Sequence, residues 1–162
     1  MIAASVAGGL LRLESLTLRV AIGRAGIVAH KQEGDGGTPR GALPLRRVLY
    51  RADRVPRPRA AVPIEPIAPD DGWCDDPTHS DYNRQVRLPH AGGCEELWRR
   101  DALYDVVGVL GWNDAPVQRG HGSAIFIHVA RAELAPTEGC LALSYGDLVD
   151  VLAAGVTCFD IK

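Results

Sequence analysis

Apolar and polar residues alternate strictly along residues 15–22, near the start of the chain. The apolar members of this segment are Leu16, Leu18, Val20 and Ile22. A period of two places them on one face of an extended chain, which predicts a half-buried β-strand. A Gly-Arg-Ala-Gly turn follows, and we expect residues 27–31 to return as the hairpin partner of this strand.

Four further segments have the length and apolar content that are typical of strands. They cover residues 42–50, 103–113, 123–130 and 156–161. In the third of them, the alternation places Ala124, Phe126 and His128 on one face of the strand. The opposite face carries Ile125, Ile127 and Val129. A histidine therefore occupies a rigid position inside an otherwise apolar strand.

Residues 145–154 have the spacing of a short amphipathic helix. Its apolar positions are Tyr145, Leu148, Val149 and Leu152. Ser144 and Asp147 form a capping pattern at its start, and Gly155 is placed to end it. A second short helix is expected around residues 94–103. Apart from these helices, the pattern predicts a β-rich chain with many loops.

The composition fits one globular domain that spans residues 1–162, with 46% apolar residues and 18 Gly and 11 Pro for its loops. The formal net charge is −2 and the basic residues are scattered, so we expect no nucleic-acid partner. No apolar segment is long enough for a membrane span. Residues 1–13 lack the basic start of a signal peptide, so none is recognisable.

The four cysteines are too few for a disulfide framework. They are Cys74, Cys94, Cys140 and Cys158. A single bridge between Cys74 and Cys94 remains open, as does a zinc site that adds His79 and His90 to this pair. Zinc sites usually contain a C-x-x-C pair, which this chain lacks, so we expect no metal.

The chemistry that the sequence offers lies at His128 and Cys140, twelve positions apart. A catalytic cysteine reacts as a thiolate and needs a base within hydrogen-bond reach, which a strand histidine can provide. Gly139 gives the loop before the cysteine a backbone freedom that suits an oxyanion hole of N–H groups. Spacing alone also fits a structural histidine and an inert thiol, and it favours that alternative.

A resemblance to a known family changes this balance. The segments IFIHVA, APTEGCLAL and GDGGTPRG resemble motifs of the L,D-transpeptidase (YkuD-type) family. In that family a histidine on a strand precedes a Ser/Thr-His-Gly-Cys motif, and a Gly-Asp-Gly-x-Thr-Pro-x-Gly loop lies upstream. The two motifs occur here in the same order, and the segment between them is unmatched.

The resemblance assigns roles residue by residue. Cys140 matches the nucleophile and His128 the general base, while Thr137 and Gly139 match the Ser/Thr and Gly of the motif. The carbonyl just after the histidine, here that of Val129, is expected to orient the imidazole. The glycine-rich loop is expected to be architectural.

The resemblance also implies a fold and a reaction. The fold would be mainly β, a YkuD-like sandwich or barrel with a few short helices. Cys140 would attack a diaminopimelate carbonyl in a peptidoglycan stem peptide, release D-alanine, and pass the acyl group to an amine of a second stem. No metal or organic cofactor would be needed, and a monomer in the periplasm or cell envelope is expected, although a cytoplasmic location stays open. A hydrolase on the same fold and an inactive cell-wall binding module are the alternatives.

Two positions depart from the family pattern. Glu138 stands where the second histidine is usual, and Ala142 stands where Asn or Arg is usual. Glu138 is a candidate third catalytic residue, which would orient His128, but it would equally fit a role in repelling acidic substrates or a solvated position.

One candidate for substrate binding, Thr137, lies within the cysteine motif. Four others lie outside the two motifs: Tyr82, Asn83, Arg84 and Trp112. An arginine can hold a substrate carboxylate through two parallel hydrogen bonds. A solvated loop without substrate contacts is the alternative for residues 82–84.

Overall fold

The computed structural model describes residues 1–162, which form fourteen strands, one α-helix and one 3-10 helix. The elements of the first half are β1 (Ala3–Ala7), β2 (Leu10–Leu13), β3 (Leu16–Arg19), β4 (Ile27–Val28), β5 (Thr38–Pro39), β6 (Gly41–Tyr50), β7 (Ile64–Pro66) and β8 (Asp71–Cys74). Those of the second half are β9 (Gln85–Arg87), β10 (Cys94–Glu96), β11 (Val106–Leu110), β12 (Phe126–Val129), η1 (Ala132–Leu134), β13 (Leu141–Leu143), α1 (Tyr145–Ala153) and β14 (Cys158–Ile161).

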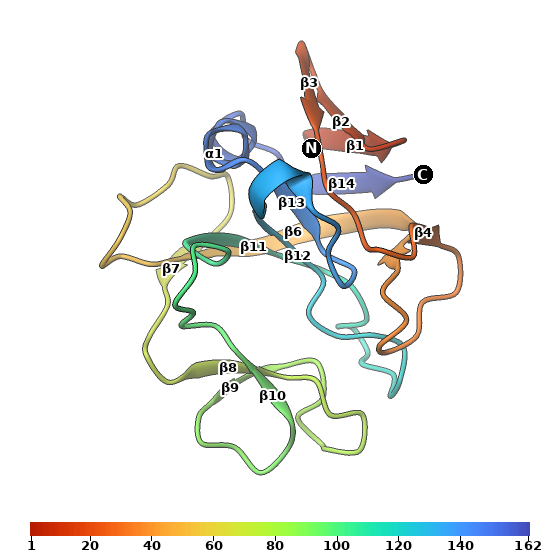
Figure 1. Cartoon of the computed structure of the whole chain (residues 1–162), viewed down its shortest axis with the longest axis vertical. Coiled ribbons are helices and arrows are strands. Elements are labelled where there is room, and N and C mark those ends of the chain that lie inside the picture. The colour runs from red at the N-terminus through yellow and green to blue at the C-terminus, as the bar shows by residue number, and fades with distance from the viewer.

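Nine strands form one large sheet, which occupies the upper part of Figure 1. Its order is β13-β12-β11-β6-β14-β1-β2-β3, with β7 paired to β6. Just after β3, Ala21 forms an antiparallel bridge with Ala142 of β13, so the two ends of the strand order meet. The sheet is therefore a nearly closed barrel, and the mainly β fold expected from the sequence is confirmed.

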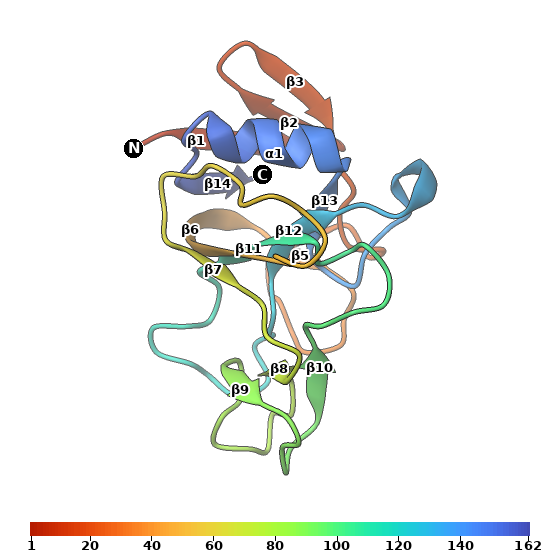
Figure 2. The ribbon, with the colours of Figure 1, turned by 90° about the vertical axis from the view of Figure 1, so that its left-hand side faces the viewer.

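Helix α1 packs against β11, β12 and β13, and Figure 2 shows it lying beside the sheet. The predicted cap is present, since the Ser144 side chain accepts a hydrogen bond from the Asp147 backbone N–H. The buried residues of the helix are Leu148, Val151 and Leu152, whereas Tyr145 is 39% exposed. The apolar stripe is thus rotated relative to the predicted one, towards Val151. No helix in the chain has the length and apolar character needed to cross a membrane.

A smaller sheet of three strands, in the order β10-β8-β9, lies below the large one in Figures 1 and 2. A second core cluster includes residues of both sheets: Leu49, Ile67, Trp73, Leu97, Tyr104, Val107, Val109 and Phe126. The rings of Trp73 and Phe126 meet edge to face, with centroids 5.1 Å apart. Strand β12 is consequently covered on both faces, and its two faces are those that the alternation predicted.

Two sequence-based expectations are wrong. Residues 27–31 do not pair with the strand before them, because β3 pairs with β2 while β4 pairs in parallel with β5. Residues 10–13, which immediately precede β3, supply its partner through a tight turn in which Glu14 has a φ of +52°. Residues 94–103 form no helix either, since β10 pairs with β8 and Leu97 is buried in the second core cluster.

The rotated helix stripe can be tested with two matched substitutions. Val151→Ala should lower the free energy of unfolding by about 2 kcal/mol, because it removes two buried methyl groups and leaves a cavity. Val149→Ala changes helix propensity equally but removes a half-buried side chain, so it should cost less than about 1 kcal/mol. Urea denaturation of both variants measures the difference. Equal losses would contradict the observed helix orientation.

Candidate active site

His128 lies in β12, and one edge of its imidazole is fixed by the backbone. Its Nδ1 atom is 2.9 Å from the carbonyl oxygen of Val129, which can only accept a hydrogen bond, so Nδ1 carries the ring proton. Nε2 is left with its lone pair. Burial lowers the pKa of His128 from its usual 6.5, and the hydrogen bond to Val129 only partly opposes this. The neutral imidazole is therefore the resting form near neutral pH.

Cys140 lies immediately before β13, and its half-buried side chain packs on the second core cluster. The thiol donates to the carbonyl oxygen of Ala124 at 3.2 Å and accepts from the Phe126 N–H at 3.3 Å. Burial, followed by the nearby Glu95 carboxylate, raises the pKa of Cys140 to about 12. The resting side chain is thus a protonated thiol, and it makes no hydrogen bond to His128.

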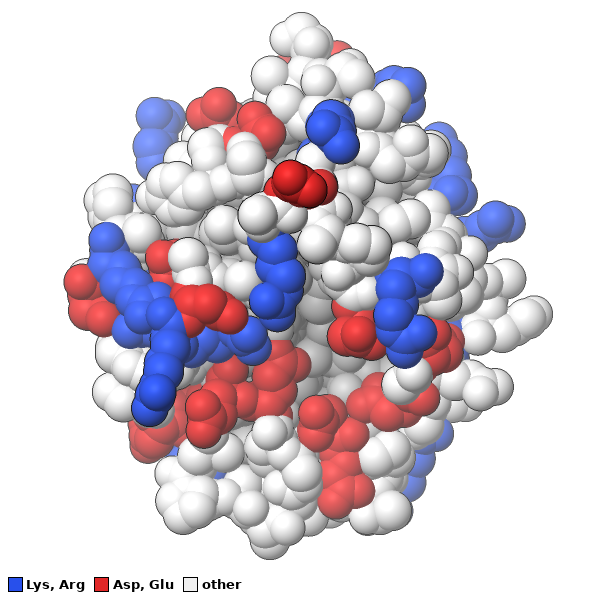
Figure 3. Space-filling view, viewed as in Figure 1, with Lys and Arg blue, Asp and Glu red and all other residues white.

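Both side chains line one cavity of about 510 Å³. Leu103, Tyr104 and Ala124 are among its less polar lining residues. The charged residues around it are Lys31, Glu33, Asp75, Glu95, Arg99, Arg131 and Glu138. Figure 3 shows basic and acidic side chains next to one another on both sides of a central hollow, with further acidic side chains below it. Charged side chains of both signs therefore border the cavity.

The glycine-rich loop upstream is in direct contact with the cysteine loop. Thr38 Oγ1 donates to the carbonyl oxygen of Gly139 at 2.9 Å and accepts from the Gly23 N–H at 2.8 Å. Gly139 has a φ of +141°, and a Cβ atom there would lie 2.7 Å from the carbonyl oxygen of Gly37. Only glycine fits at position 139, because both the backbone conformation and the close approach exclude a side chain.

Thr137 shapes the turn that presents the cysteine. Its hydroxyl donates to the carbonyl oxygen of Cys140 at 2.6 Å and accepts from the Gly139 N–H at 3.1 Å. The backbone N–H of Cys140 itself has no hydrogen-bond partner in the protein. This turn therefore holds one free donor beside the thiol.

The two positions that depart from the family pattern have different surroundings. Glu138 is exposed at the cavity rim and forms an ion pair with Arg24 at 3.0 Å. It makes no hydrogen bond to His128, whose Nδ1 is held by the backbone instead. Ala142 is buried in β13, opposite His128 in the parallel register, and adds no polar group to the cavity.

The structure does not bring the other expected substrate-binding residues to this cavity. Tyr82 is buried, and its hydroxyl accepts from the Gly122 N–H at 3.0 Å. Asn83 is buried too, and its Oδ1 accepts from the N–H of Ala124, the residue whose carbonyl holds the thiol. Arg84 and Trp112 line a separate hollow of about 410 Å³. Asn83 thus fixes the backbone of Ala124, whose carbonyl oxygen accepts the hydrogen bond from the Cys140 thiol.

The sequence pattern did not identify Glu95 and Tyr104, which also line the cavity. Tyr104 donates a hydrogen bond to Glu95, and its ring meets the His128 imidazole edge to face with centroids 5.4 Å apart. Burial raises the pKa of Glu95, and the hydrogen bond from Tyr104 opposes this shift. Assigning residues 94–96 to a strand would have placed Glu95 on the opposite face from its neighbours, but the predicted helix concealed this signal.

The contact between the two loops predicts a specific sensitivity at Gly139. Gly139→Ala should lower the melting temperature by roughly 5–10 °C, because the new methyl group meets the backbone of Gly37 and the φ is strained. Gly146→Ala is the matched control, since its surroundings are open and alanine suits the first helical turn. Differential scanning calorimetry compares the two variants. An unchanged melting temperature for Gly139→Ala would contradict the close approach.

Comparison with known proteins identifies the family of the chain. The family model of the YkuD L,D-transpeptidase catalytic domain matches residues 8–154 of the 162-residue chain. The matched region includes the glycine-rich loop, His128 and Cys140. No curated protein and no solved structure matches the chain. The family match covers most of the sequence, and the chain belongs to the YkuD L,D-transpeptidase catalytic domain family.

Proposed function

We propose that this protein is a cysteine-dependent L,D-transpeptidase that acts on peptidoglycan stem peptides through an acyl-enzyme on Cys140. The observation that carries the proposal is the cavity that Cys140 and His128 share, with the imidazole held by Val129 so that Nε2 is free to accept a proton. Membership of the family supports the substrate class. The chemistry requires neither a metal nor an organic cofactor.

The first step in this proposal is proton transfer within a neutral pair. The thiol must release the carbonyl oxygen of Ala124 and reach Nε2 of His128, either directly after rotation of the side chain or through one water molecule. Sulfur then bonds to the diaminopimelate carbonyl carbon, and the proton resides on the imidazole. Because the thiol and the imidazole are both neutral at rest, the thiolate forms only when His128 takes up the proton.

The tetrahedral intermediate needs donors for its developing negative charge. The free backbone N–H of Cys140 is the donor that we assign to this oxyanion. Collapse of the intermediate breaks the bond to the terminal D-alanine, whose nitrogen takes the proton from His128. The product of this half-reaction is a thioester on Cys140.

In the second half-reaction an amine of another stem attacks the thioester. The new amide bond forms, the carbon–sulfur bond breaks, and His128 carries the amine proton back to the thiolate. Arg131 lies at the cavity and takes part in no ion pair, so we assign it to a substrate carboxylate. Since the substrate lies in the cell envelope, we place the protein on the periplasmic side.

Incubation with purified disaccharide tetrapeptides tests this function. The native chain should produce cross-linked dimers and free D-alanine, which mass spectrometry of the muropeptides detects. Cys140→Ala should produce neither, and His128→Gln should slow the reaction by about 10²–10⁴-fold, because the base is lost. Cys158→Ser is the control and should react normally.

Each outcome of this experiment is informative. Shortened monomers without dimers would replace transfer by hydrolysis and retain the nucleophile. Products from Cys140→Ala at the native rate would overturn the assignment of Cys140.

The lowered pKa of His128 predicts the pH dependence of acylation. A carbapenem, which resembles an acyl donor, should form one covalent adduct on Cys140. Protonation removes the base, so the adduct rate should fall with decreasing pH only below pH 6.5, the ordinary pKa of histidine. Intact-protein mass spectrometry measures the rate, and circular dichroism at each pH checks that the fold persists. A midpoint above 6.5 would exclude a buried neutral His128 as the base.

A further inference from the structure

Two cysteines of the small sheet face each other away from the active-site cavity. Cys74 in β8 and Cys94 in β10 are direct partners in the antiparallel register. Residues opposite each other in such a pair project their side chains to the same face of the sheet. Cys74 is buried, Cys94 is half-buried, and both thiols are free.

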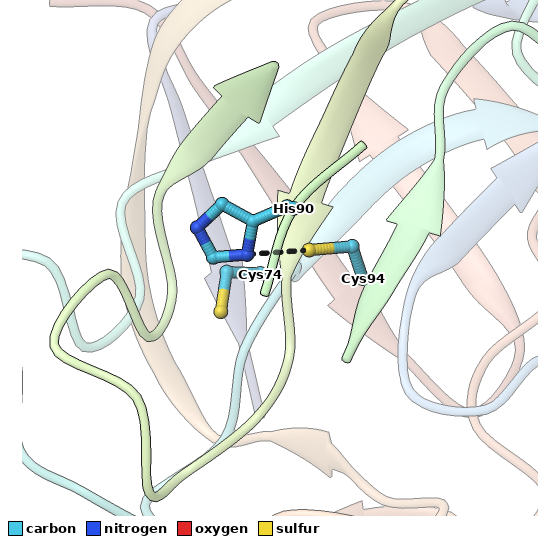
Figure 4. A group of neighbouring side chains, drawn as sticks. All are labelled: Cys74, His90 and Cys94. Atoms are coloured by element: carbon cyan, nitrogen blue, oxygen red, sulfur yellow. Dashed lines mark hydrogen bonds between the residues drawn. The ribbon is translucent and has the colours of Figure 1, made fainter. Parts of the chain in front are cut away.

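His90 completes a cluster with these thiols. Its Nδ1 atom is 3.3 Å from Cys94 Sγ, the contact drawn as a dashed line in Figure 4. Nδ1 also accepts a hydrogen bond from the Gly92 N–H at 3.1 Å, which requires an unprotonated nitrogen. An unprotonated ring nitrogen therefore lies within contact distance of the Cys94 thiol, and its lone pair is shared with the Gly92 N–H.

The other ring nitrogen of His90 is fixed by a carboxylate. Nε2 is 2.9 Å from Oδ2 of Asp81, and an ionised carboxylate can only accept, so Nε2 carries the proton. Histidines that bind a metal usually donate their other ring N–H to a carboxylate. This hydrogen bond fixes the tautomer and the orientation of the ring.

The spacing of the three ligand atoms suits one small ion. Cys74 Sγ, Cys94 Sγ and His90 Nδ1 all lie within 4.8 Å of one another. Sulfur and nitrogen ligands of a tetrahedral zinc ion lie about 3.6–3.8 Å apart, given the usual Zn–S and Zn–N distances. Side-chain shifts smaller than about 1.5 Å would close the site around the ion. Two thiolates with an imidazole are ligands that zinc prefers over magnesium or calcium.

We propose that Cys74, Cys94 and His90 bind one zinc ion, with Asp81 orienting His90 from outside the ligand set. Binding replaces the two thiol protons by two Zn–S bonds and releases these protons to solvent. The group does not extend to a fourth side chain, so water completes the tetrahedron. This site replaces the sequence-based expectation of no metal, and His79, which the sequence grouped with it, packs against the His90 ring instead.

The proposed ion would link the small sheet to the active site. It connects β8 to β10, and residue 95, next to the ligand Cys94, is the half-buried glutamate that lines the candidate active-site cavity. Side chains of neighbouring strand residues point to opposite faces, so the ion and the cavity lie on opposite sides of β10. The proposed role is structural, since the ion holds the wall that carries Glu95.

A disulfide between Cys74 and Cys94 is the main competing state. Two observations favour the ion: the Cys94 thiol contacts the imidazole, and Asp81 supports that imidazole from behind. A disulfide would use neither His90 nor Asp81.

Elemental analysis of purified protein tests the site directly. After dialysis against zinc and removal of the excess, the native chain should retain about one zinc ion per molecule. Cys94→Ser and Cys74→Ser should lose it, whereas Cys158→Ser, which changes a cysteine in β14, should retain it. A native chain without zinc, or equal retention by all three variants, would overturn the proposal.

Two further measurements do not depend on the folding of the cysteine variants. Cobalt added to the native chain should give the near-ultraviolet absorption of thiolate ligation. Asp81→Asn keeps all three ligands and should weaken zinc binding by about 10–100-fold in competition with a chelator. An absent cobalt–thiolate band, unchanged affinity in Asp81→Asn, or a Cys74–Cys94 disulfide found by alkylation without reductant would each overturn the zinc site.

Discussion

The hydrogen bond from Thr38 to the carbonyl oxygen of Gly139 joins two loops that lie 101 residues apart, and the position of Cys140 depends on it. The same contact brings the backbone of Gly37 so close that residue 139 must be glycine. Aligning two distant loops costs chain entropy, which the surrounding sheet offsets by fixing both loop ends. The glycine-rich motif therefore positions the turn that carries Cys140, although it contributes no reactive group.

Burial determines the chemical state of the two reactive side chains. It raises the pKa of the Cys140 thiol and lowers that of the His128 imidazole, so both are neutral at rest. Such a pair differs from the thiolate–imidazolium pair of many cysteine enzymes. A neutral, half-buried thiol reacts slowly with small electrophiles and oxidants, and in the proposed function only a substrate in the cavity would activate it.

The sequence predicted those parts of the fold that local patterns determine. The two faces of β12 and the Ser144 cap of α1 follow from periodicity and from one side chain respectively, so both were predictable. The pairing of β3 depends on which of its two neighbouring segments becomes its partner, and the strand at residues 94–96 depends on β8 some twenty residues earlier, so the pattern within either segment does not reveal its partner. The same reason explains why Asn83, a buried support, was expected to contact substrate, and why Glu95 was missed.

The bridge between Ala21 and Ala142 has a consequence for how a peptide can approach Cys140. Strand β13 pairs with β12 on one side, and the bridge occupies its other side. The strand next to the nucleophile therefore has no open edge at that point, so a peptide cannot dock there by strand addition. In the proposed function, the stem peptide would instead approach from above the face of the sheet and be recognised by side chains and loop N–H groups that line the cavity.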